Sequence, residues 1–417
     1  MSEAARRGYK FLTEKPYLQP DFDESVFDQA WTTWPQPLRS QAEKATPAER
    51  RQLAFLRYGL TPRPGDSSGK PLQYVVGGDG QWTMNCFACH SGRVAGRVVP
   101  GLPNAHYALE TLTEETRTVK VNVGKTLSRM DVGSVFMPLG TTDGTTNAVM
   151  FGVALMAYRD ADLNVYVDRP VPKMVHHDMD AIPWWHFRKR DMLYIDGFAP
   201  RTHRGLMQFM MIRQNGPEKF REWEPDFKDV YQFLMELRPP KYPYPIEAKL
   251  ASSGEAAFNR VCAECHGTYG ERETYPKRIV PIGEVGTDRV RLDSLSAEHR
   301  RGYGASWFNN YGEKAVVESP GGYLAPPLDG VWASAPYLHN GSVPTLYDLL
   351  LPEDQRPARF AVGRREYDPE KVGFRYDGDA PWVLDTAIPG NRNTGHRYGT
   401  DLTEADRLAL LEHLKTL

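Results

Sequence analysis

Hydrophobic residues recur at helical spacing towards the end of the chain. Three leucines fall on one stripe of a helix within residues 402–417: Leu408, Leu411 and Leu414. Thr403, followed three positions later by Asp406, has the sequence of a helix N-cap. The pattern therefore predicts a C-terminal helix that begins after Thr403 and packs through its leucine face.

A second helical pattern lies in the middle of the chain. Gly254, Phe258 and Cys262 are four positions apart and share one helix face. Four other stretches have helical patterns: residues 47–58, 144–158, 204–212 and 220–236. Strand patterns are few, so the sequence predicts a mainly α fold with long loops.

A proline-rich segment divides the chain. Four prolines fall within residues 238–245, and because proline fixes φ and lacks a donor, we expect a stiff, extended linker there. The linker is placed at residues 239–245, between a domain of residues 1–238 and a domain of residues 246–417. Residues 1–80 are expected to form an N-terminal extension that covers the core of the first domain.

Composition narrows the classes of function only slightly. The chain has 417 residues and a formal net charge of −2, so its charge gives no reason to expect a nucleic acid as partner. No run of 18 apolar residues occurs, and no transmembrane helix is predicted.

The cysteines carry the clearest chemical signal. There are four, in the pairs Cys86/Cys89 and Cys262/Cys265, and each pair is followed at once by a histidine. In the C-x-x-C-H motif two thiols attach to the vinyl groups of a haem and the adjacent imidazole binds its iron. The sequence therefore predicts two covalently bound haem c groups, with His90 and His266 as iron ligands, in two cytochrome c-like domains.

Other uses of C-x-x-C pairs explain less of the pattern. A zinc site does not need a histidine directly after each pair, and a thioredoxin-like motif needs one pair rather than two. Disulfides remain an alternative in an oxidising compartment.

The cysteines also bear on the compartment. Covalent haem attachment is normally a periplasmic process, whereas the first residues of the chain lack the apolar stretch of a secretion signal. We expect a periplasmic or secreted protein whose signal was removed before residue 1.

One stretch of the second domain resembles a known superfamily. Residues 334–342 read Ser-Ala-Pro-Tyr-Leu-His-Asn-Gly-Ser, and Pro-Thr-Leu follows at 344–346. This is similar to the A-P-Y-x-H-D/N-G-S-x-x-T-L signature of bacterial di-haem cytochrome c peroxidases and of MauG, the methylamine dehydrogenase maturation enzyme. Pro-Trp-Trp at 183–185 and Gly-His at 395–396 resemble the rubber oxygenase branch of that superfamily.

The resemblance implies roles around the first haem. It implies that His90 and His266 are the proximal ligands, one for each haem. His106 follows His90 by 16 positions, an offset at which some peroxidases place a capping histidine; the alternative is a loop histidine near the haem edge. The peroxidases also place a tryptophan between their haems, and Trp185, Trp184 or Tyr194 are the candidates here, unless these aromatic side chains only pack the domain interface.

The resemblance also implies a calcium ion between the domains. In the peroxidases backbone carbonyls of the A-P-Y run bind it, and the corresponding positions are Ser334 and Pro336. Asp143 stands where the family's side-chain ligand falls, and oxygen ligands of this kind suit calcium.

The second haem departs from the peroxidase pattern, which supplies methionine as sixth ligand. The last methionine is Met235, so the second domain has none. Of its other histidines, His299 falls in a charged run, His339 in the signature and His413 in the terminal helix. His396 falls just before the terminal helix, where a class-one cytochrome brings its distal ligand over the haem. We predict bis-histidine ligation by His266 and His396, which lowers the haem potential relative to methionine ligation.

Two functions are compatible with these features. The first is a haem oxidoreductase, peroxidase-like or oxygenase-like, in which haem 1 activates peroxide or O2 and haem 2 relays electrons to or from a small redox protein or small-molecule substrate. The second is an electron carrier without catalysis. His203 lies in a histidine-rich segment before the linker and is a candidate acid or base near haem 1, with an ordinary polar loop as the alternative.

Overall fold

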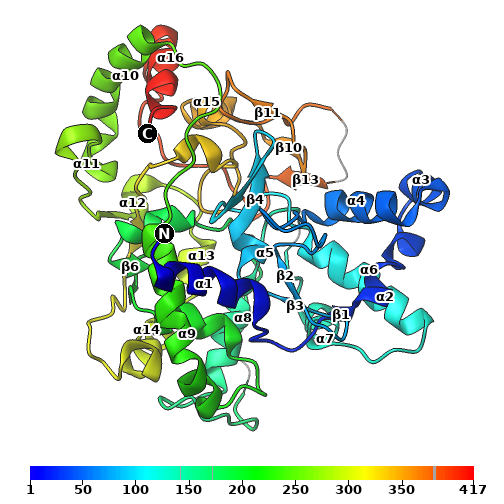
Figure 1. The fold of residues 1–417 in the computed structure, drawn as a ribbon. Helices are drawn as coiled ribbons and strands as arrows, with labels where there is room; N and C mark the ends of the chain where they lie inside the picture. Colours follow the sequence, from blue (N-terminus) through cyan, green and yellow to red (C-terminus); the bar gives the residue numbers. More distant parts are fainter. Residues whose placement is uncertain (141, 171, 379–381) are drawn as a thin grey trace.

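The computed structural model describes residues 1–140, 142–170, 172–378 and 382–417. These residues are mostly helical, as the pattern predicts (Figure 1). The α-helices are α1 (Glu3–Glu14), α2 (Glu24–Phe27), α3 (Leu38–Lys44), α4 (Pro47–Tyr58), α5 (Phe87–His90), α6 (Leu109–Asn122), α7 (Arg129–Phe136), α8 (Ala148–Ala157), α9 (Pro217–Glu236), α10 (Ala248–Val261), α11 (Ala263–His266), α12 (Ile282–Val285), α13 (Val290–Asp293), α14 (Ala297–Ala305), α15 (Leu346–Leu349) and α16 (Glu404–Leu414).

Short 3-10 helices and short strands fill the loops between these helices. The 3-10 helices are η1 (Ala30–Thr33), η2 (Trp184–Arg188), η3 (Arg204–Met210), η4 (Gly270–Arg272), η5 (Trp307–Asn309), η6 (Val331–Ala333) and η7 (Glu353–Gln355). The strands are β1 (Phe22–Asp23), β2 (Tyr74–Val76), β3 (Gln81–Met84), β4 (Ser91–Val94), β5 (Arg97–Pro100), β6 (Met192–Leu193), β7 (Ala199–Pro200), β8 (Ile279–Pro281), β9 (Gly322–Leu324), β10 (Arg359–Val362), β11 (Tyr367–Asp368), β12 (Gly373–Phe374) and β13 (Trp382–Asp385).

The strands pair only in antiparallel fashion and form small sheets. One sheet has three strands in the order β1-β3-β2, and the others are two-stranded: β4-β5, β6-β7, β8-β9, β10-β13 and β11-β12. Strands are thus more numerous than the pattern indicates, because each has at most four residues and is too short to give an alternating signal.

Two pairs of crossed helices organise the molecule. In the first half α1 crosses α9, and in the second half α10 crosses α16 (Figure 1). A glycine makes each crossing possible: a Cβ on Gly8 would lie 2.3 Å from the carbonyl oxygen of Asp229, and one on Gly254 would lie 1.9 Å from that of Ala409. The two halves therefore use the same close backbone contact.

This arrangement changes the expected role of the N-terminus. The sequence predicts that residues 1–80 cover the core as an extension, whereas α1 lies within the core of the first half. Tyr9 of α1 packs edge-on against Phe87 and Phe233, with ring centres 5.6 Å apart in both pairs. The part that projects, at the right of Figure 1, is the segment with α2, α3 and α4.

Most predicted helices are present. The pattern at 47–58 corresponds to α4, and Thr403 caps α16 by accepting a hydrogen bond from the backbone N–H of Asp406, as predicted. Residues 204–210 form a 3-10 helix rather than an α-helix. Residues 239–245, the predicted linker, contain no helix or strand.

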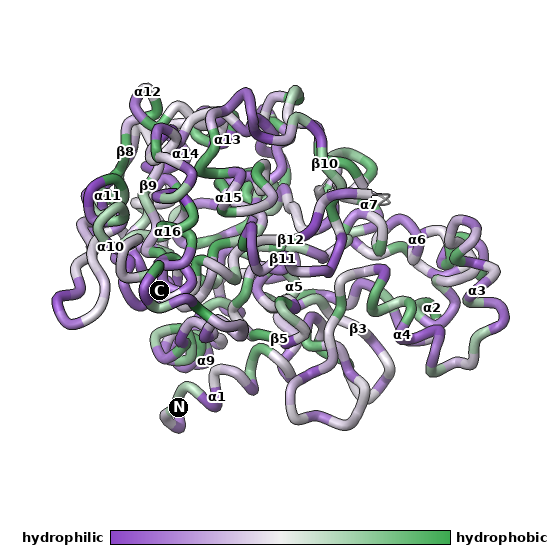
Figure 2. Tube along the Cα trace, turned by 90° about the horizontal axis from the view of Figure 1, so that it is seen from above, coloured by the Kyte–Doolittle hydropathy of each residue, from purple (hydrophilic) through white to green (hydrophobic). Residues whose placement is uncertain are grey.

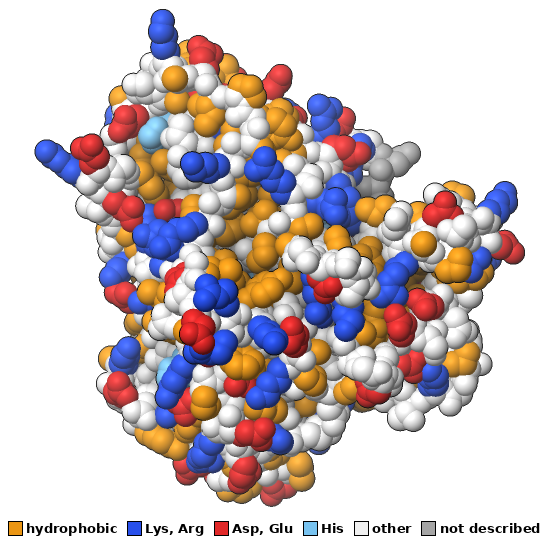
Figure 3. Space-filling model, in the orientation of Figure 1, with side chains coloured by type: hydrophobic (Ala, Val, Ile, Leu, Met, Phe, Trp, Pro, Cys, Tyr) orange, Lys and Arg blue, Asp and Glu red, His pale blue; other side chains and the backbone are white. Residues whose placement is uncertain are grey.

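The surface is mixed in charge. Figure 3 shows basic and acidic side chains interspersed over one face, with hydrophobic side chains gathered along its middle. Polar stretches of the chain lie mainly on outer loops (Figure 2). Among the described helices, none is both long and apolar enough to cross a bilayer.

Candidate functional site

The first C-x-x-C-H motif lies on α5, a single helical turn. Phe87, between the two cysteines, is fully buried against Trp184 and Phe233 and anchors the turn in the core. Cys86 and Cys89 are partly exposed and form no disulfide. The disulfide alternative is therefore not what the structure shows at this pair.

His90, the last residue of α5, is held in a defined orientation. Its Nδ1 lies 3.1 Å from the carbonyl oxygen of Ile182, and its ring stacks on Trp184 with centres 4.8 Å apart. A hydrogen bond from Nδ1–H to a carbonyl leaves Nε2 free as a metal ligand. Burial lowers the pKa of His90 to about 4, which keeps the imidazole neutral, as iron ligation requires.

The second motif has the same design. Helix α10 leads directly into Cys262 and α11, and Cys262 and Cys265 form no disulfide. The Nδ1 of His266 lies 2.7 Å from the carbonyl oxygen of Pro326, so its Nε2 is again free. Burial lowers the pKa of His266 as well.

A second imidazole faces His266. The ring centres of His266 and His396 are 6.2 Å apart, and the ring planes are inclined at 51°. An imidazole nitrogen binds a metal ion at about 2 Å and lies about 1.1 Å from its ring centre, so two imidazoles on one ion have centres about 6 Å apart. The observed spacing therefore matches a shared iron.

The loop that carries His396 is fixed by two charged residues. The buried guanidinium of Arg356 donates to the carbonyl oxygens of Asn393 and Gly395 at 2.6 and 2.8 Å, and to that of His396 at 3.2 Å. Glu353 accepts a hydrogen bond from the backbone N–H of Gly395 at 2.8 Å. Together these hydrogen bonds fix the conformation of the loop.

The backbone of this loop is strained where the imidazole projects. His396 has φ 48°, in the left-handed region that non-glycine residues rarely adopt. Its N–H donates to the carbonyl oxygen of Val285 at 2.7 Å. A Cβ on Gly395 would lie 2.3 Å from that same oxygen, so only glycine allows the approach. Strain that the surroundings enforce in this way is typical of a functional position.

Among the described residues, no imidazole faces His90 in the way that His396 faces His266. His106 lies elsewhere: it is buried, its Nε2 is 2.9 Å from the carbonyl oxygen of Arg364, and its ring packs edge-on against Phe374. The capping role that the resemblance implies for His106 stays a prediction.

The other predicted catalytic residues occupy different places. Trp185 is buried at the junction of the two halves, and its Nε1–H donates to the carbonyl oxygen of Asp329 at 2.6 Å. His203 forms a hydrogen bond with Glu224, with Nε2 and Oε1 2.8 Å apart. The contacts of His203 are with Glu224 and its surroundings rather than with either C-x-x-C-H motif.

The residues predicted for calcium give a mixed picture. Among the described side chains, no group of three or more His, Cys, Asp or Glu is arranged to hold a metal ion. Asp143 and Ser334 each have a buried oxygen without a hydrogen-bond partner, Oδ1 and Oγ. Burial raises the pKa of Asp143 to about 7. A calcium ion would depend on backbone oxygens such as those of Ser334 and Pro336, and the site stays a prediction.

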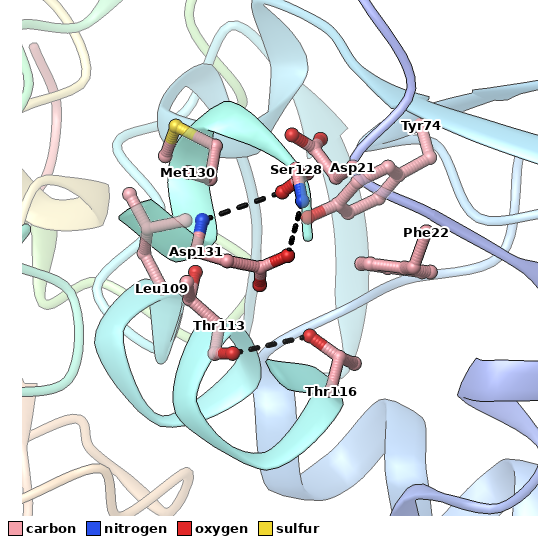
Figure 4. A pocket seen from close by; sticks show the side chains of 9 residues that line it. All are labelled: Asp21, Phe22, Tyr74, Leu109, Thr113, Thr116, Ser128, Met130 and Asp131. Carbon is pink, nitrogen blue, oxygen red and sulfur yellow. Dashed lines mark hydrogen bonds between the residues drawn. The ribbon is translucent and has the colours of Figure 1, made fainter. Parts of the chain in front are cut away.

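A small cavity in the first half is separate from the haem groups. It lies between β1, α6 and α7 with a volume of about 10 Å³, and its lining includes Asp21, Tyr74 and Asp131 (Figure 4). Asp131 pairs with the buried Lys120. None of the residues that line the cavity belongs to either cysteine motif, and its size suits a single water molecule.

Sequence reasoning missed the residues that position the histidines. Ile182 and Pro326 act through backbone oxygens, which leave no trace in side-chain chemistry. Arg356 is 4% exposed, but in the sequence it looks like any other arginine of a loop, and nothing there indicates its burial.

The comparisons with known proteins agree with the geometry of the second half. Residues 322–361 match the family described as RoxA-like, cytochrome c-like. This segment contains Pro326 and Arg356, which orient the two facing histidines.

Two curated relatives are similar over a larger part of the chain. The uncharacterized protein y4iJ of Sinorhizobium fredii is 32% identical over 43% of this chain and 41% of that protein. The uncharacterized protein y4iM of the same organism is 37% identical over 39% of this chain and 40% of that protein. The chain thus spans about two fifths of the length of these relatives. It carries a RoxA-like, cytochrome c-like segment, and its two cysteine pairs fit covalent haem c.

Proposed function

We propose that the protein is a di-haem c-type oxidoreductase in which the haem at Cys86–His90 reacts and the haem at Cys262–His266 relays electrons. One observation carries this proposal: His266 is faced by a second imidazole, 6.2 Å away between ring centres, whereas no imidazole of the described residues faces His90. A haem iron with two strong axial ligands exchanges electrons without losing a ligand, whereas an iron with one such ligand can bind O2 or peroxide.

The segment that joins the halves supports transfer between the haems. Ile182 and Trp184 contact His90, while Trp185 and His186 both bond to the carbonyl oxygen of Asp329, at 2.6 and 3.0 Å. Asp329 lies three positions after Pro326, the partner of His266. A short run of bonded and hydrogen-bonded atoms therefore links the two proximal histidines.

The surroundings of the first motif favour an apolar substrate. Helix α8 has apolar residues on every side, and it packs in the same cluster as Phe87 and Cys86. Met150 and Val153 of α8 are buried. Its other large apolar side chains are only partly buried against the same cluster, so they keep exposed surface that can line a site. An apolar wall of this kind suits O2 and a hydrophobic organic substrate better than heterolysis of peroxide, which needs an acid or base.

The same features support a finer proposal. Among the branches of the peroxidase superfamily that the sequence resembles, we place the protein nearest the rubber oxygenase-like branch, with the segment at 322–361 as support. We further propose that it acts in the periplasm or is secreted, and that it exchanges electrons with a small redox protein.

The test is rapid mixing of the fully reduced protein with O2, and separately with hydrogen peroxide, followed at the absorption bands of both haems. We expect the absorption band of haem 1 to change first, and the band of haem 2 to show oxidation afterwards. An electron carrier without catalysis would instead show slow oxidation of both haems together, and this result would reject the proposal.

A further inference from the structure

The guanidinium of Arg291 is buried and has no hydrogen-bond partner among the described residues. Arg291 lies on the short helix α13 and is 1% exposed. None of its three guanidinium nitrogens makes a hydrogen bond with any described residue. The nearest carboxylate oxygen, Oδ2 of Asp196, is 3.6 Å from Nη1, and this oxygen instead accepts a hydrogen bond from Arg300 at 2.9 Å.

The contrast with Arg300 shows that this is unusual for the same environment. Arg300 is also buried, and it donates to the carbonyl oxygens of Leu295 and Leu292 in addition to Asp196. The ion pair with Asp196 at 3.6 Å offsets part of the cost of burying this charge. All three guanidinium nitrogens still lack a hydrogen bond, and a buried donor without an acceptor is destabilising. These donors therefore favour an additional acceptor that the described residues do not supply.

The position of Arg291 indicates where that acceptor comes from. Its charge acts on His177 of the first half and on His339 of the second, and burial together with this charge lowers the pKa of both to about 4. His339 packs against Tyr323 of β9, with ring centres 4.5 Å apart. The strand β9 leads directly to Pro326, which holds His266. Arg291, 3.6 Å from Asp196 of the first half, thus lies at the junction of the two halves, and β9 connects this junction to the segment that holds His266.

His177, one of the two histidines on which the charge of Arg291 acts, also has an atom without a partner. The Nε2 of His177 is buried and makes no hydrogen bond within the described part of the chain, while its Nδ1 is 3.1 Å from the carbonyl oxygen of Val175. The two groups that lack partners, one from each half, fit a polar group inserted between the halves.

We propose that Arg291 is the receptor for a carboxylate at this junction, and that a haem propionate supplies the carboxylate. The inference rests on the proposed function, because it requires bound haem. The planar guanidinium fits a carboxylate with two parallel hydrogen bonds. By placing a positive charge beside the haem, Arg291 disfavours the oxidised, more positive iron and raises the haem potential.

The experiment is infrared difference spectroscopy between the oxidised and reduced protein, made with natural haem and with haem carrying ¹³C in its propionate carboxyls. It is run on the wild type, on Arg291→Gln and Arg291→Lys, and on Arg289→Gln as control. Arg289 is exposed, two positions away, and carries the same charge in a pair with Asp293. The mass of each sample is measured first, because fewer than two haems in the wild type would reject the proposed function itself.

With two haems present, we expect an isotope-sensitive carboxylate band that shifts in Arg291→Gln, recovers in part in Arg291→Lys and is unchanged in Arg289→Gln. The potential of one haem should fall in Arg291→Gln only. A free carboxylate is the other source, and it would show as a potential that responds to added sodium acetate in the wild type but not in Arg291→Gln, without an isotope-sensitive shift; this result would overturn the assignment to propionate. If Arg291→Gln does not fold, a wild-type band with the frequency of a fully hydrated propionate overturns the proposal. The proposal is also overturned if a folded Arg291→Gln variant shows neither a band shift nor a change in haem potential.

Discussion

The two cysteine motifs of this chain are nearly identical, but their surroundings differ. In both, a helix crossing with a buried glycine supports the motif, and a backbone carbonyl orients the histidine through Nδ1. His266 then faces His396, whereas His90 is stacked on Trp184 and no described imidazole faces it. The two motifs therefore share their attachment chemistry and differ in what faces the histidine, and the proposed function assigns the relay and the reactive centre on this difference.

The largest expected effect concerns attachment itself. Replacing Cys86 and Cys89 together by alanine, or Cys262 and Cys265 together, should remove one covalent haem in each case, because both thioether bonds of that haem are lost. Intact mass after expression with periplasmic haem attachment measures this. A double variant that keeps two covalent haems would contradict the assignment of one haem to each cysteine motif.

The next effect concerns the sixth ligand of haem 2. In His396→Ala the oxidised haem should become high spin, because one strong ligand is removed, and His396→Met should raise its potential. Visible and electron paramagnetic resonance spectra provide the measurement. His299→Ala is the control, since His299 lies on α14 and bonds to Ser296, the N-cap of that helix; a spin change there and not in His396→Ala would place the ligand elsewhere.

A smaller effect is expected from the residue that positions His396. Arg356 donates to three carbonyl oxygens of the 393–396 loop, and since hydrogen bonds from a charged group contribute about 1.5–3 kcal/mol each, Arg356→Ala should lower the free energy of unfolding by about 3 kcal/mol or more. A high-spin fraction at haem 2 should accompany the loss, which a purely structural role would not produce.

Denaturant unfolding and the spin state are measured on the same samples. Arg359→Ala is the control, because Arg359 is 68% exposed and pairs only loosely with Asp385, at 3.6 Å; it should change stability by less than about 1 kcal/mol. Equal effects of the two substitutions on the spin state would contradict the positioning role.

The smallest effect tests the shared feature of the two halves. Gly8→Ala and Gly254→Ala should each destabilise the protein by about 1–3 kcal/mol, because the new methyl group meets a facing backbone. Gly302→Ala on α14 meets no atom within 4 Å and should be neutral or stabilising by up to about 1 kcal/mol. Thermal unfolding of the three variants gives the comparison, and a stable Gly8→Ala would show that α1 is not part of the first core.

The sequence predicts the local features of this molecule well. The two motifs, the Thr403 cap and helices such as α4 depend on residues within a few positions of each other, and the structure has them where expected. The relation of α1 to the first motif could not be predicted, because the whole segment from residue 15 to residue 85 separates them, while α10 runs directly into the second.

The candidate site divides in the same way. His396 could be singled out because the second domain lacks methionine and has few histidines. Arg356 and Arg291 could not, since their roles arise from contacts with residues distant in sequence. Short strands such as β9 could not be predicted either, because tertiary packing rather than periodicity determines them. The pattern at 204–212 predicted a helix but not its 3-10 form.

The central claim is that haem 2 is closed by two histidines and haem 1 is open. Carbon monoxide titration of the reduced wild-type protein tests it most directly, because the gas binds only where a position on the iron is free or easily freed. We predict one CO bound per two haems, rising to two in His396→Ala. Two CO per chain in the wild type, or none, would contradict the account.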